Sequence, residues 1–366
     1  MQTIAFRADA SLNIGTGHVM RCLTLADALR DEGYSSLFIC REHPGNLIDI
    51  IRQRGYEAVA LPYQGTVTAV PSSVPSPIHA AWLGSDWETD AQQTQAALAN
   101  VNTSWLVVDH YSLDSRWENR FRTSIPHLLV IDDLADRSHD CDLLLDQNLG
   151  RRWEDYSAHV PPGCVVLTGP DYVLLRPEFH LARSFGLRRR TQPDFKHLLI
   201  TMGGIDKGNV TAEVLSALRL CPLPSDARIT IVMGSRSPWL EAVRQAATEL
   251  PWHTEVKVDV NNMAELMANS DLAIGAAGST AWERCCVGLP SIMVVLADNQ
   301  LIIAQMLSHA GGAFTIESAA AIAIKLPDIL TQLVNDAALR QATAAAASRI
   351  VDGEGVRRVI QAMENT

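Results

Sequence analysis

The chain has 366 residues, of which 47% are hydrophobic and 19% charged, and a formal net charge of -11 at pH 7. That length is enough for two globular domains, and the negative charge argues against nucleic acid and anionic membranes as general partners. Seven scattered cysteines without a C-x-x-C pair, no basic and apolar leader, and no apolar run long enough to cross a bilayer predict a cytoplasmic protein without a membrane segment.

Strands and helices alternate through the first half of the sequence, which predicts a parallel sheet built from βα units. Buried strands are expected at 3–6, 36–40, 58–61, 105–108 and 128–131, and helices at 19–30, 47–54, 86–99 and 115–123. The segment 62–77 is rich in Pro, Ser, Thr and Val and is expected to be a long surface loop, a candidate flap.

A charge run and a proline at 186–193, after a helical stretch at 177–184, indicate a linker between two domains. Alternation then restarts, with strands expected at 196–201, 229–233, 255–258, 272–274 and 291–296, and helices at 239–250, 263–269, 319–347 and from 209, 279 and 356 onward. We therefore predict an α/β fold of two Rossmann-like domains facing a ligand cleft at the carboxyl ends of their strands. The predicted boundaries are 1–187 and 194–350, followed by a C-terminal helix at 351–366.

The turn between the first strand and the first helix is the most informative part of the sequence. Gly15 and Gly17 deliver His18 to the start of a helix. One interpretation is a tight turn that needs positive φ, with His18 facing solvent. The other is a turn whose N–H groups face the cleft, where the positive end of the helix dipole keeps His18 an uncharged base. A dinucleotide fingerprint is excluded, because no third glycine follows Gly17 at the required spacing.

Two turns in the second half have the composition of a phosphate site. Gly203 and Gly204 follow one predicted strand, while Gly278, Ser279 and Thr280 follow another and open a helix. Small residues let backbone amides approach phosphate oxygens, and a helix start favours negative charge. A plain turn is the alternative for the paired glycines.

Glu283 and a polar triplet each have two possible roles. Thr280-x-x-Glu283 is a capping box, but a carboxylate at that position can instead accept the two hydroxyls of a ribose. Asp298, Asn299 and Gln300 follow a predicted strand, where they either hold sugar hydroxyl or acetamido groups or cap the next helix. The sequence leaves both alternatives open.

Titratable residues also follow two strands of the first half. Asp109, His110 and Tyr111 bring a second titratable cluster to the expected rim of the cleft. Asp132 and Asp133 are adjacent on an extended segment, so their side chains point to opposite sides and lack partner ligands. A cap for the following turn is expected there rather than a magnesium site. The histidines show no metal-binding spacing, and we expect no metal.

Motifs in both halves carry a resemblance to a known family. They lie at 7–11, 14–22, 108–111, 131–135, 174–179, 202–204, 277–285, 288–291 and 298–300. Together they resemble the PseG family, whose members are UDP-2,4-diacetamido-2,4,6-trideoxy-β-L-altropyranose hydrolases of pseudaminic acid biosynthesis. The motifs of the second half also resemble the nucleotide-binding half of MurG-type glycosyltransferases. The Gly-x-Gly-His-x-x-Arg opening with Asp-His-Tyr is the more selective part.

The resemblance implies a GT-B-like architecture and the removal of UDP by water attack at the anomeric carbon, with inversion. It implies His18 as the base that activates water, with Tyr111 and Asn299 near the sugar. It further implies that the Gly203–Gly204 turn, Ser279 and Thr280 hold the diphosphate and that Glu283 holds the ribose. The other candidates for substrate binding are Gly15, Gly17, Arg21, Asp109, Gly278 and Gln300.

The partner expected from this resemblance is a small-molecule UDP-sugar, without a cofactor. UDP is a good leaving group whose developing charge helix N-termini can take up, so no metal is required. One rival is a MurG-like glycosyltransferase that uses an acceptor hydroxyl instead of water. A second is a non-catalytic UDP-sugar binder, which has no need of His18. No membrane-contacting apolar and basic patch is identified in the first domain, and this favours hydrolysis.

Overall fold

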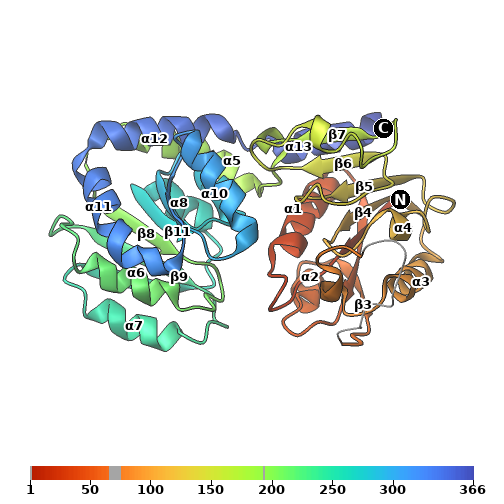
Figure 1. Cartoon of the computed structure of the whole chain (residues 1–366), viewed down its shortest axis with the longest axis horizontal. Coiled ribbons are helices and arrows are strands. Elements are labelled where there is room, and N and C mark those ends of the chain that lie inside the picture. The colour runs from red at the N-terminus through yellow and green to blue at the C-terminus, as the bar shows by residue number, and fades with distance from the viewer. Residues whose placement is uncertain (1, 66–75, 193) are drawn as a thin grey trace. The chain divides into compact units, whose positions relative to one another are not determined.

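The computed structural model describes residues 2–65, 76–192 and 194–366. These residues form two compact units. Unit 1 holds the chain up to Leu174 together with Glu354–Thr366, and unit 2 holds Leu175–Gly353. Each unit contains its own parallel sheet, as the alternating pattern predicts (Figure 1).

Unit 1 is built on a seven-stranded sheet with the order β3-β2-β1-β4-β5-β6-β7, in which all neighbouring strands are parallel. Its strands are β1 (Thr3–Ala8), β2 (Ser35–Arg41), β3 (Glu57–Leu61), β4 (Thr103–Asp109), β5 (His127–Ile131), β6 (Leu143–Asp146) and β7 (Val165–Thr168). Its α-helices are α1 (Gly17–Asp31), α2 (Ile48–Gln53), α3 (Trp87–Leu98), α4 (Ser115–Glu118) and α13 (Gly355–Asn365), with 3-10 turns η1 (Ala80–Leu83), η2 (Trp153–Asp155) and η3 (Pro170–Tyr172). The sequence did not predict β6 and β7, which are only four residues long.

Helices cover both faces of this sheet because alternate residues of each strand point to opposite sides. Ile4 and Phe6 of β1 belong to a core that includes buried residues of α1, α2 and α13. Ala5, between them, belongs to a second core that includes buried residues of α3 and Trp117 of α4. The near-continuous apolar strands of the sequence follow from this burial on both faces.

Unit 2 contains a six-stranded parallel sheet with the order β10-β9-β8-β11-β12-β13. Its strands are β8 (His197–Thr201), β9 (Arg228–Met233), β10 (His253–Val258), β11 (Leu272–Ala276), β12 (Ser291–Val294) and β13 (Phe314–Ile316). Its helices are α5 (Pro177–Arg189), α6 (Val210–Leu218), α7 (Leu240–Thr248), α8 (Met263–Asn269), α9 (Thr280–Cys286), α10 (Leu301–His309), α11 (Ile322–Asn335) and α12 (Ala337–Ile350), with 3-10 turns η4 (Asp298–Gln300) and η5 (Ala319–Ala321).

The expected domain boundary at 187–194 differs from the division seen in the structure. Helix α5 continues to Arg189, through the first part of the predicted linker, and unit 2 already begins at Leu175. Arg183 explains this attachment, because its guanidinium donates to the carbonyls of Cys286, Ser348 and Val351. Every residue has a backbone carbonyl, so the sequence does not reveal which carbonyls Arg183 will bind.

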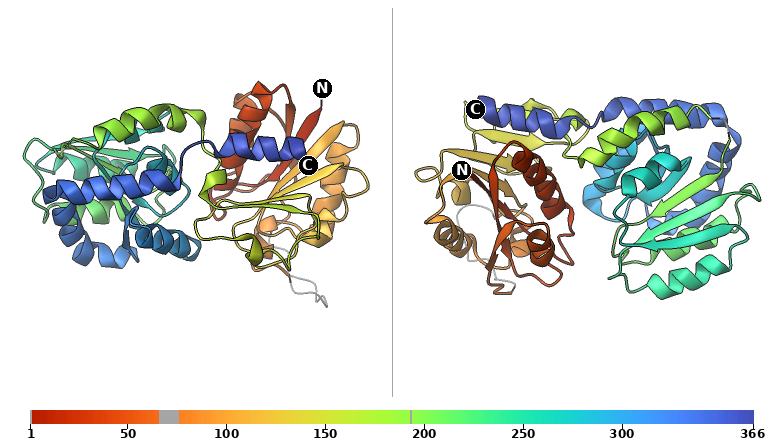
Figure 2. Two further views of the ribbon diagram at one scale, coloured as in Figure 1. Left: turned by 90° about the horizontal axis from the view of Figure 1, so that it is seen from above. Right: turned by 180° about the vertical axis from the view of Figure 1, so that it is seen from behind.

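The last helix also departs from the predicted order, because α13 follows unit 2 in the sequence but belongs to unit 1 (Figure 2). Val359, Ile360 and Met363 of α13 are buried in the same core as Val19 and Leu23 of α1. The predicted loop at 62–77 lies largely outside the described residues, since these omit 66–75. Among the helices that are described, none is long and apolar enough to cross a membrane.

Candidate active site

His18 lies where the strand order of unit 1 reverses. Strand β1 has β2 on one side and β4 on the other, so the segments that follow β1 and β4 diverge at the carboxyl edge of the sheet. Ligands of open α/β sheets bind at such a switch point. The turn after β1 leads into α1 and its second residue, His18, while β4 ends at Asp109. The fold thus brings together two residues that are 91 positions apart.

The turn before His18 is held by Ser11. Its hydroxyl accepts hydrogen bonds from the N–H groups of Asn13 and Ile14, and its carbonyl accepts the Gly15 N–H at 2.9 Å. Gly15 has φ +83°, a conformation that favours glycine, whereas Gly17 is the first residue of α1. No side chain caps α1. The first N–H groups of the helix have no acceptor within the helix, and here no side chain replaces one.

The His18 ring is fixed by a buried carboxylate. Nδ1 of His18 lies 2.6 Å from Oδ1 of Asp109, and His18 is only 7% exposed. Burial alone would raise the pKa of Asp109, but the charge of Arg21 and the His18 ring outweigh it and hold the pKa well below its ordinary value. Since an ionised carboxylate only accepts hydrogen bonds, Nδ1 must carry the proton. That leaves Nε2 as the ring nitrogen that can accept a proton.

Arg21 joins this pair to a second carboxylate. Its guanidinium binds both oxygens of Asp109 at 2.6 and 2.7 Å and Oδ2 of Asp133 at 2.8 Å. Asp133 in turn accepts the hydroxyl of Tyr111 at 2.6 Å. Burial and the Asp133 charge raise the pKa of Tyr111 well above its ordinary value, so the hydroxyl stays protonated. Asp109 is fully buried, and its Oδ1 contacts the His18 ring. Its expected role in substrate binding stays a prediction.

Aromatic residues that the sequence did not single out surround Tyr111. Its ring meets that of His18 edge-on with centroids 4.6 Å apart, and the ring centroids of His79 and Trp82 lie 5.6 and 6.2 Å from that of Tyr111. His79 precedes η1 and Trp82 lies within it. Neither residue type stands at a spacing that indicates a site, so no sequence signal pointed to them.

A buried ionic network supports the end of β1. Arg7 binds both Asp9 and Asp90 in pairs of hydrogen bonds between 2.6 and 3.1 Å, and Arg41 shares Asp90 at 2.6 Å. His110 points into this network, with Nε2 3.2 Å from Asp9, and is therefore separated from its neighbours Asp109 and Tyr111. Burial lowers the pKa of His110. The three-residue cluster expected from the sequence thus divides into one residue that supports the scaffold and two that serve the site.

Asp132 and Asp133 bind different partners, because Asp133 contacts Arg21 and Tyr111 whereas Asp132 does not. Oδ2 of Asp132 accepts the N–H groups of Leu134 and Ala135 at 3.1 and 2.8 Å, which is the turn cap expected there. Within the described residues, no group of three or more His, Cys, Asp or Glu side chains is placed to hold a metal ion.

The candidate phosphate turns of unit 2 follow neighbouring strands. The Gly203–Gly204 turn comes after β8 and Gly278 after β11, and the strand order reverses between these two strands. Gly203 has φ +95°, and the carbonyl of Gly204 accepts the N–H of Gly234 at 2.9 Å. Asp206 caps α6 through the N–H groups of the first two residues of that helix. Asn209, the N-cap residue of α6, makes no side-chain cap bond itself.

The capping box, one of the two alternatives for Glu283, does not form at the start of α9. Ser279 is the N-cap residue and makes no side-chain cap bond, while Thr280 Oγ1 accepts from the buried Arg284 at 3.2 Å. Glu283 lies 3.5 Å from Arg176. Burial raises the pKa of Glu283 against the opposing charge of Arg176. The Glu283 carboxylate is therefore not used to close the helix end.

Gln300 reaches the turn at Gly278. Its Oε1 accepts the N–H of Leu296 at 3.0 Å, and its Nε2 lies 3.9 Å from the place where a Cβ on Gly278 would be. Asn299 stands beside it in η4, after β12. Three predicted segments, at 203–204, 278–280 and 299–300, thus follow the adjacent strands β8, β11 and β12.

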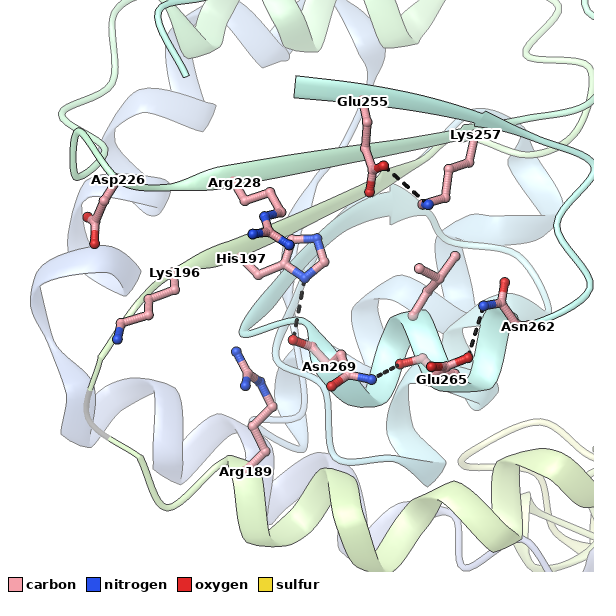
Figure 3. Close-up of a pocket in the computed structure, with 11 residues that line it drawn as sticks. Arg189, Lys196, His197, Asp226, Arg228, Glu255, Lys257, Asn262, Glu265 and Asn269 are labelled. Atoms are coloured by element: carbon pink, nitrogen blue, oxygen red, sulfur yellow. Dashed lines mark hydrogen bonds and ion pairs between the residues drawn. The ribbon is translucent and has the colours of Figure 1, made fainter. Parts of the chain in front are cut away.

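A separate pocket of about 570 Å³ lies at the amino ends of β8 and β9, whereas the three candidate segments follow the carboxyl ends of their strands (Figure 3). No residue of the predicted site lines it. Its cations and carboxylates are largely engaged with one another or with neighbours, as in Lys257 with Glu255 at 3.2 Å and Arg189 with Asp271 at 2.8 Å. A ligand there would have to displace these pairs.

Comparison with known proteins agrees with the fold of the two units. Residues 198–362 match the glycosyltransferase family 28 C-terminal domain. The crystal structure of MurG from Acinetobacter baumannii has a TM-score of 0.70 and 16% sequence identity, over 100% of this chain and 99% of that one. This likeness confirms the predicted fold class, two Rossmann-like α/β domains of the GT-B type.

Curated relatives extend the similarity to named enzymes. The UDP-2,4-diacetamido-2,4,6-trideoxy-beta-L-altropyranose hydrolase of Campylobacter jejuni is 27% identical over 84% of this chain and 97% of its own length. The spore coat polysaccharide biosynthesis protein SpsG of Bacillus subtilis is 29% identical over 55% of this chain. The chain spans 58% of the length of SpsG and 56% of that of a further curated relative. These matches confirm the resemblance to a UDP-sugar hydrolase and to MurG-type proteins that the motifs indicate.

Proposed function

We propose that this protein is a nucleotide-sugar hydrolase that removes UDP from UDP-2,4-diacetamido-2,4,6-trideoxy-β-L-altropyranose. The observation that carries the proposal is the His18–Asp109 contact of 2.6 Å, which leaves Nε2 of His18 as the proton acceptor. A buried carboxylate behind a histidine holds the ring in the tautomer and orientation that a general base can use. Support for hydrolysis also comes from the Campylobacter relative, whose match covers both units instead of the nucleotide-binding half alone.

The proposed reaction uses His18 to take a proton from water as the water oxygen attacks the anomeric carbon. The bond between that carbon and the UDP oxygen breaks, its electron pair leaves with UDP, and attack from the opposite face gives inversion. Asp109 stabilises the imidazolium that forms, and Arg21 keeps Asp109 ionised. Tyr111 is proposed to lie beside the sugar.

The proposal assigns UDP to unit 2. The N–H groups of residues 278–280 have no acceptor among the described residues, and Gly278 carries no side chain that would keep phosphate oxygens away. These amides, with the Gly203–Gly204 turn, would take up the charge that develops on the diphosphate. Glu283, free of a capping role, would accept the ribose hydroxyls.

The test measures UDP release from the purified sugar nucleotide without any acceptor. Wild type should release UDP, while His18→Phe should not, although UDP binding measured by calorimetry should stay close to that of wild type. Solvent oxygen-18 should appear in the sugar, because water attacks carbon. Full turnover by His18→Phe would contradict the base assignment, and label in UDP would mean attack at phosphorus.

A second candidate, a UDP-sugar glycosyltransferase, is favoured by the match of residues 198–362 to the glycosyltransferase family 28 domain. The same experiment separates the two activities. A transferase would release UDP only when an acceptor hydroxyl is supplied, and a non-catalytic binder would release none under either condition.

A further inference from the structure

Three aromatic rings, those of Tyr111, His79 and Trp82, form a contiguous cluster that meets the ring of the candidate base His18. His18 and Tyr111 have centroids 4.6 Å apart, Tyr111 and His79 are 5.6 Å apart, and His79 and Trp82 are 4.3 Å apart. Trp82 also approaches Tyr111 directly, at 6.2 Å. We call Tyr111, His79 and Trp82 the aromatic wall.

The aromatic wall is anchored from behind. Leu83, next to Trp82 in η1, is buried in the core between the sheet, α3 and α4. The hydroxyl of Ser112 donates to the carbonyl of His79 at 2.5 Å, and Asp133 holds the Tyr111 hydroxyl. His79 and Trp82 nevertheless stay partly exposed. The structure thus presents these rings to a ligand in fixed positions, with little ordering left to occur on binding.

The chemistry of the wall differs from that of the ionic groups next to His18 and Tyr111. There, Arg21 and the two carboxylates Asp109 and Asp133 form a charged and fully paired network. The wall offers π faces, and burial lowers the pKa of His79, which favours its uncharged ring. Such a surface attracts C–H and methyl groups, and it carries no positive charge to attract a phosphate.

We propose that Trp82 and His79, together with Tyr111, receive the apolar groups of the sugar and thereby select a deoxy, N-acetylated pyranose over a pyranose with a free 6-hydroxyl. This inference rests on the proposed function and adds its sugar specificity. A 6-deoxy sugar presents a methyl group where an ordinary hexose presents a hydroxyl, and each acetamido group adds another methyl. Packing against the wall favours these methyl groups, whereas a hydroxyl in the same place would lose its hydrogen bonds to water.

The first test compares two substrates: UDP-2,4-diacetamido-2,4,6-trideoxy-β-L-altropyranose and UDP-N-acetylglucosamine. Trp82→Ala should lower kcat/KM for the deoxy substrate by about 10-fold or more, the range known for one apolar group in a hydrophobic pocket. The change for UDP-N-acetylglucosamine should be much smaller, so that discrimination between the two sugars falls. Trp82→Phe should retain most of the discrimination. Trp153→Ala, which removes a tryptophan of unit 1 that is 57% exposed, is the matched control and should behave as wild type.

The second test does not depend on turnover. Saturation-transfer NMR on a His18→Asn background, with the aromatic protons of the protein irradiated, should give strong signals at the sugar methyl groups. Adding Trp82→Ala should weaken these signals relative to those of the uracil ring. Equal methyl signals with and without Trp82, or an equal loss of kcat/KM for both sugars, would overturn the proposed role of the aromatic wall in sugar selection. A different pair of results would contradict only the proposed hydrolysis. In that case the methyl signals would still depend on Trp82, but the wild-type protein would release no UDP.

Discussion

At the residue scale, the site depends on a histidine whose two ring nitrogens have different environments. Nδ1 faces the buried Asp109, and Arg21 binds both oxygens of that carboxylate. The helix dipole at the start of α1, from which the sequence analysis argued, is a weaker influence than an ionised carboxylate at 2.6 Å. The carboxylate sets the tautomer, and the tautomer decides which nitrogen can act as a base.

Replacing Asp109 should therefore impair catalysis without removing the base itself. In Asp109→Asn the amide can donate to Nδ1, which moves the ring proton to Nε2 and leaves no acceptor for the proton of water. We expect kcat to fall by about 10²- to 10⁴-fold, the contribution of a positioned general base, with little change in KM. Steady-state UDP release measures both. The control is Asp49→Asn, at a carboxylate that is 88% exposed, and a kcat of Asp109→Asn close to wild type would contradict the tautomer argument.

A second histidine in unit 1 contributes to stability instead of chemistry. Nδ1 of His139 lies 2.7 Å from Oε1 of the buried Glu118, whose Oε2 accepts the N–H of Asp140. Burial would lower the pKa of His139, but the Glu118 charge outweighs it and raises the pKa above the ordinary 6.5. The folded state thus binds the proton more tightly than the unfolded chain does.

This raised pKa predicts the pH dependence of the stability. The stabilisation from the His139–Glu118 pair should be complete below about pH 6.5 and be lost as the pH rises through the folded-state pKa. His139→Asn keeps a donor toward Glu118 but removes the charge. The difference in free energy of unfolding between wild type and this variant should shrink as the pH rises, by at most about 1.4 kcal/mol per pH unit. Urea titrations from pH 5 to 9 measure it, with the exposed His253→Asn as control, and a constant difference would refute the charge on His139.

At the element scale, the same strand–turn–helix unit serves the two sheets differently. After β1 the turn delivers a side chain, His18, to the carboxyl edge of the sheet. After β11 the turn consists of small residues, so that backbone amides are accessible there. Two glycines here have different surroundings: Gly275 lies near the end of β11, and Gly278 lies in the turn itself. A Cβ on Gly275 would lie 2.7 Å from Arg284 and 2.9 Å from the carbonyl of Thr201, whereas a Cβ on Gly278 would meet nothing closer than 3.9 Å.

The two alanine substitutions should consequently separate packing from ligand binding. Gly275→Ala should destabilise unit 2 by about 1–3 kcal/mol, the usual cost of overpacking, because the Arg284 guanidinium and a backbone carbonyl would have to move. Gly278→Ala should leave stability unchanged but weaken UDP binding, because its methyl group would occupy the proposed place of the diphosphate. Urea unfolding and calorimetric titration with UDP measure the two effects. Wild-type UDP affinity in Gly278→Ala would contradict the assignment of this turn to the diphosphate.

At the scale of the whole molecule, the chain does not divide into consecutive domains. Its last helix, α13, contributes Val359 and Met363 to the core of unit 1, although the preceding residues 175–353 form unit 2. The sequence predicted α13 correctly as a helix with one apolar face. The sequence could not assign the helix to a unit. An apolar face indicates that the helix packs against another apolar surface, but it does not indicate which surface.

The sequence by itself determined the alternation of buried strands and helices, hence two parallel sheets, and it placed His18, the Gly203–Gly204 turn and the turn at Gly278 after strands of those sheets. These features depend on local periodicity and turn chemistry, which lie within a few residues of one another. Only the tertiary structure decided that Asp109 orients His18, that Glu283 does not cap α9, and that His79 and Trp82 stand beside Tyr111. Such contacts join residues far apart in the chain, and hydrogen bonding and ring packing act through space without a fixed spacing in the sequence.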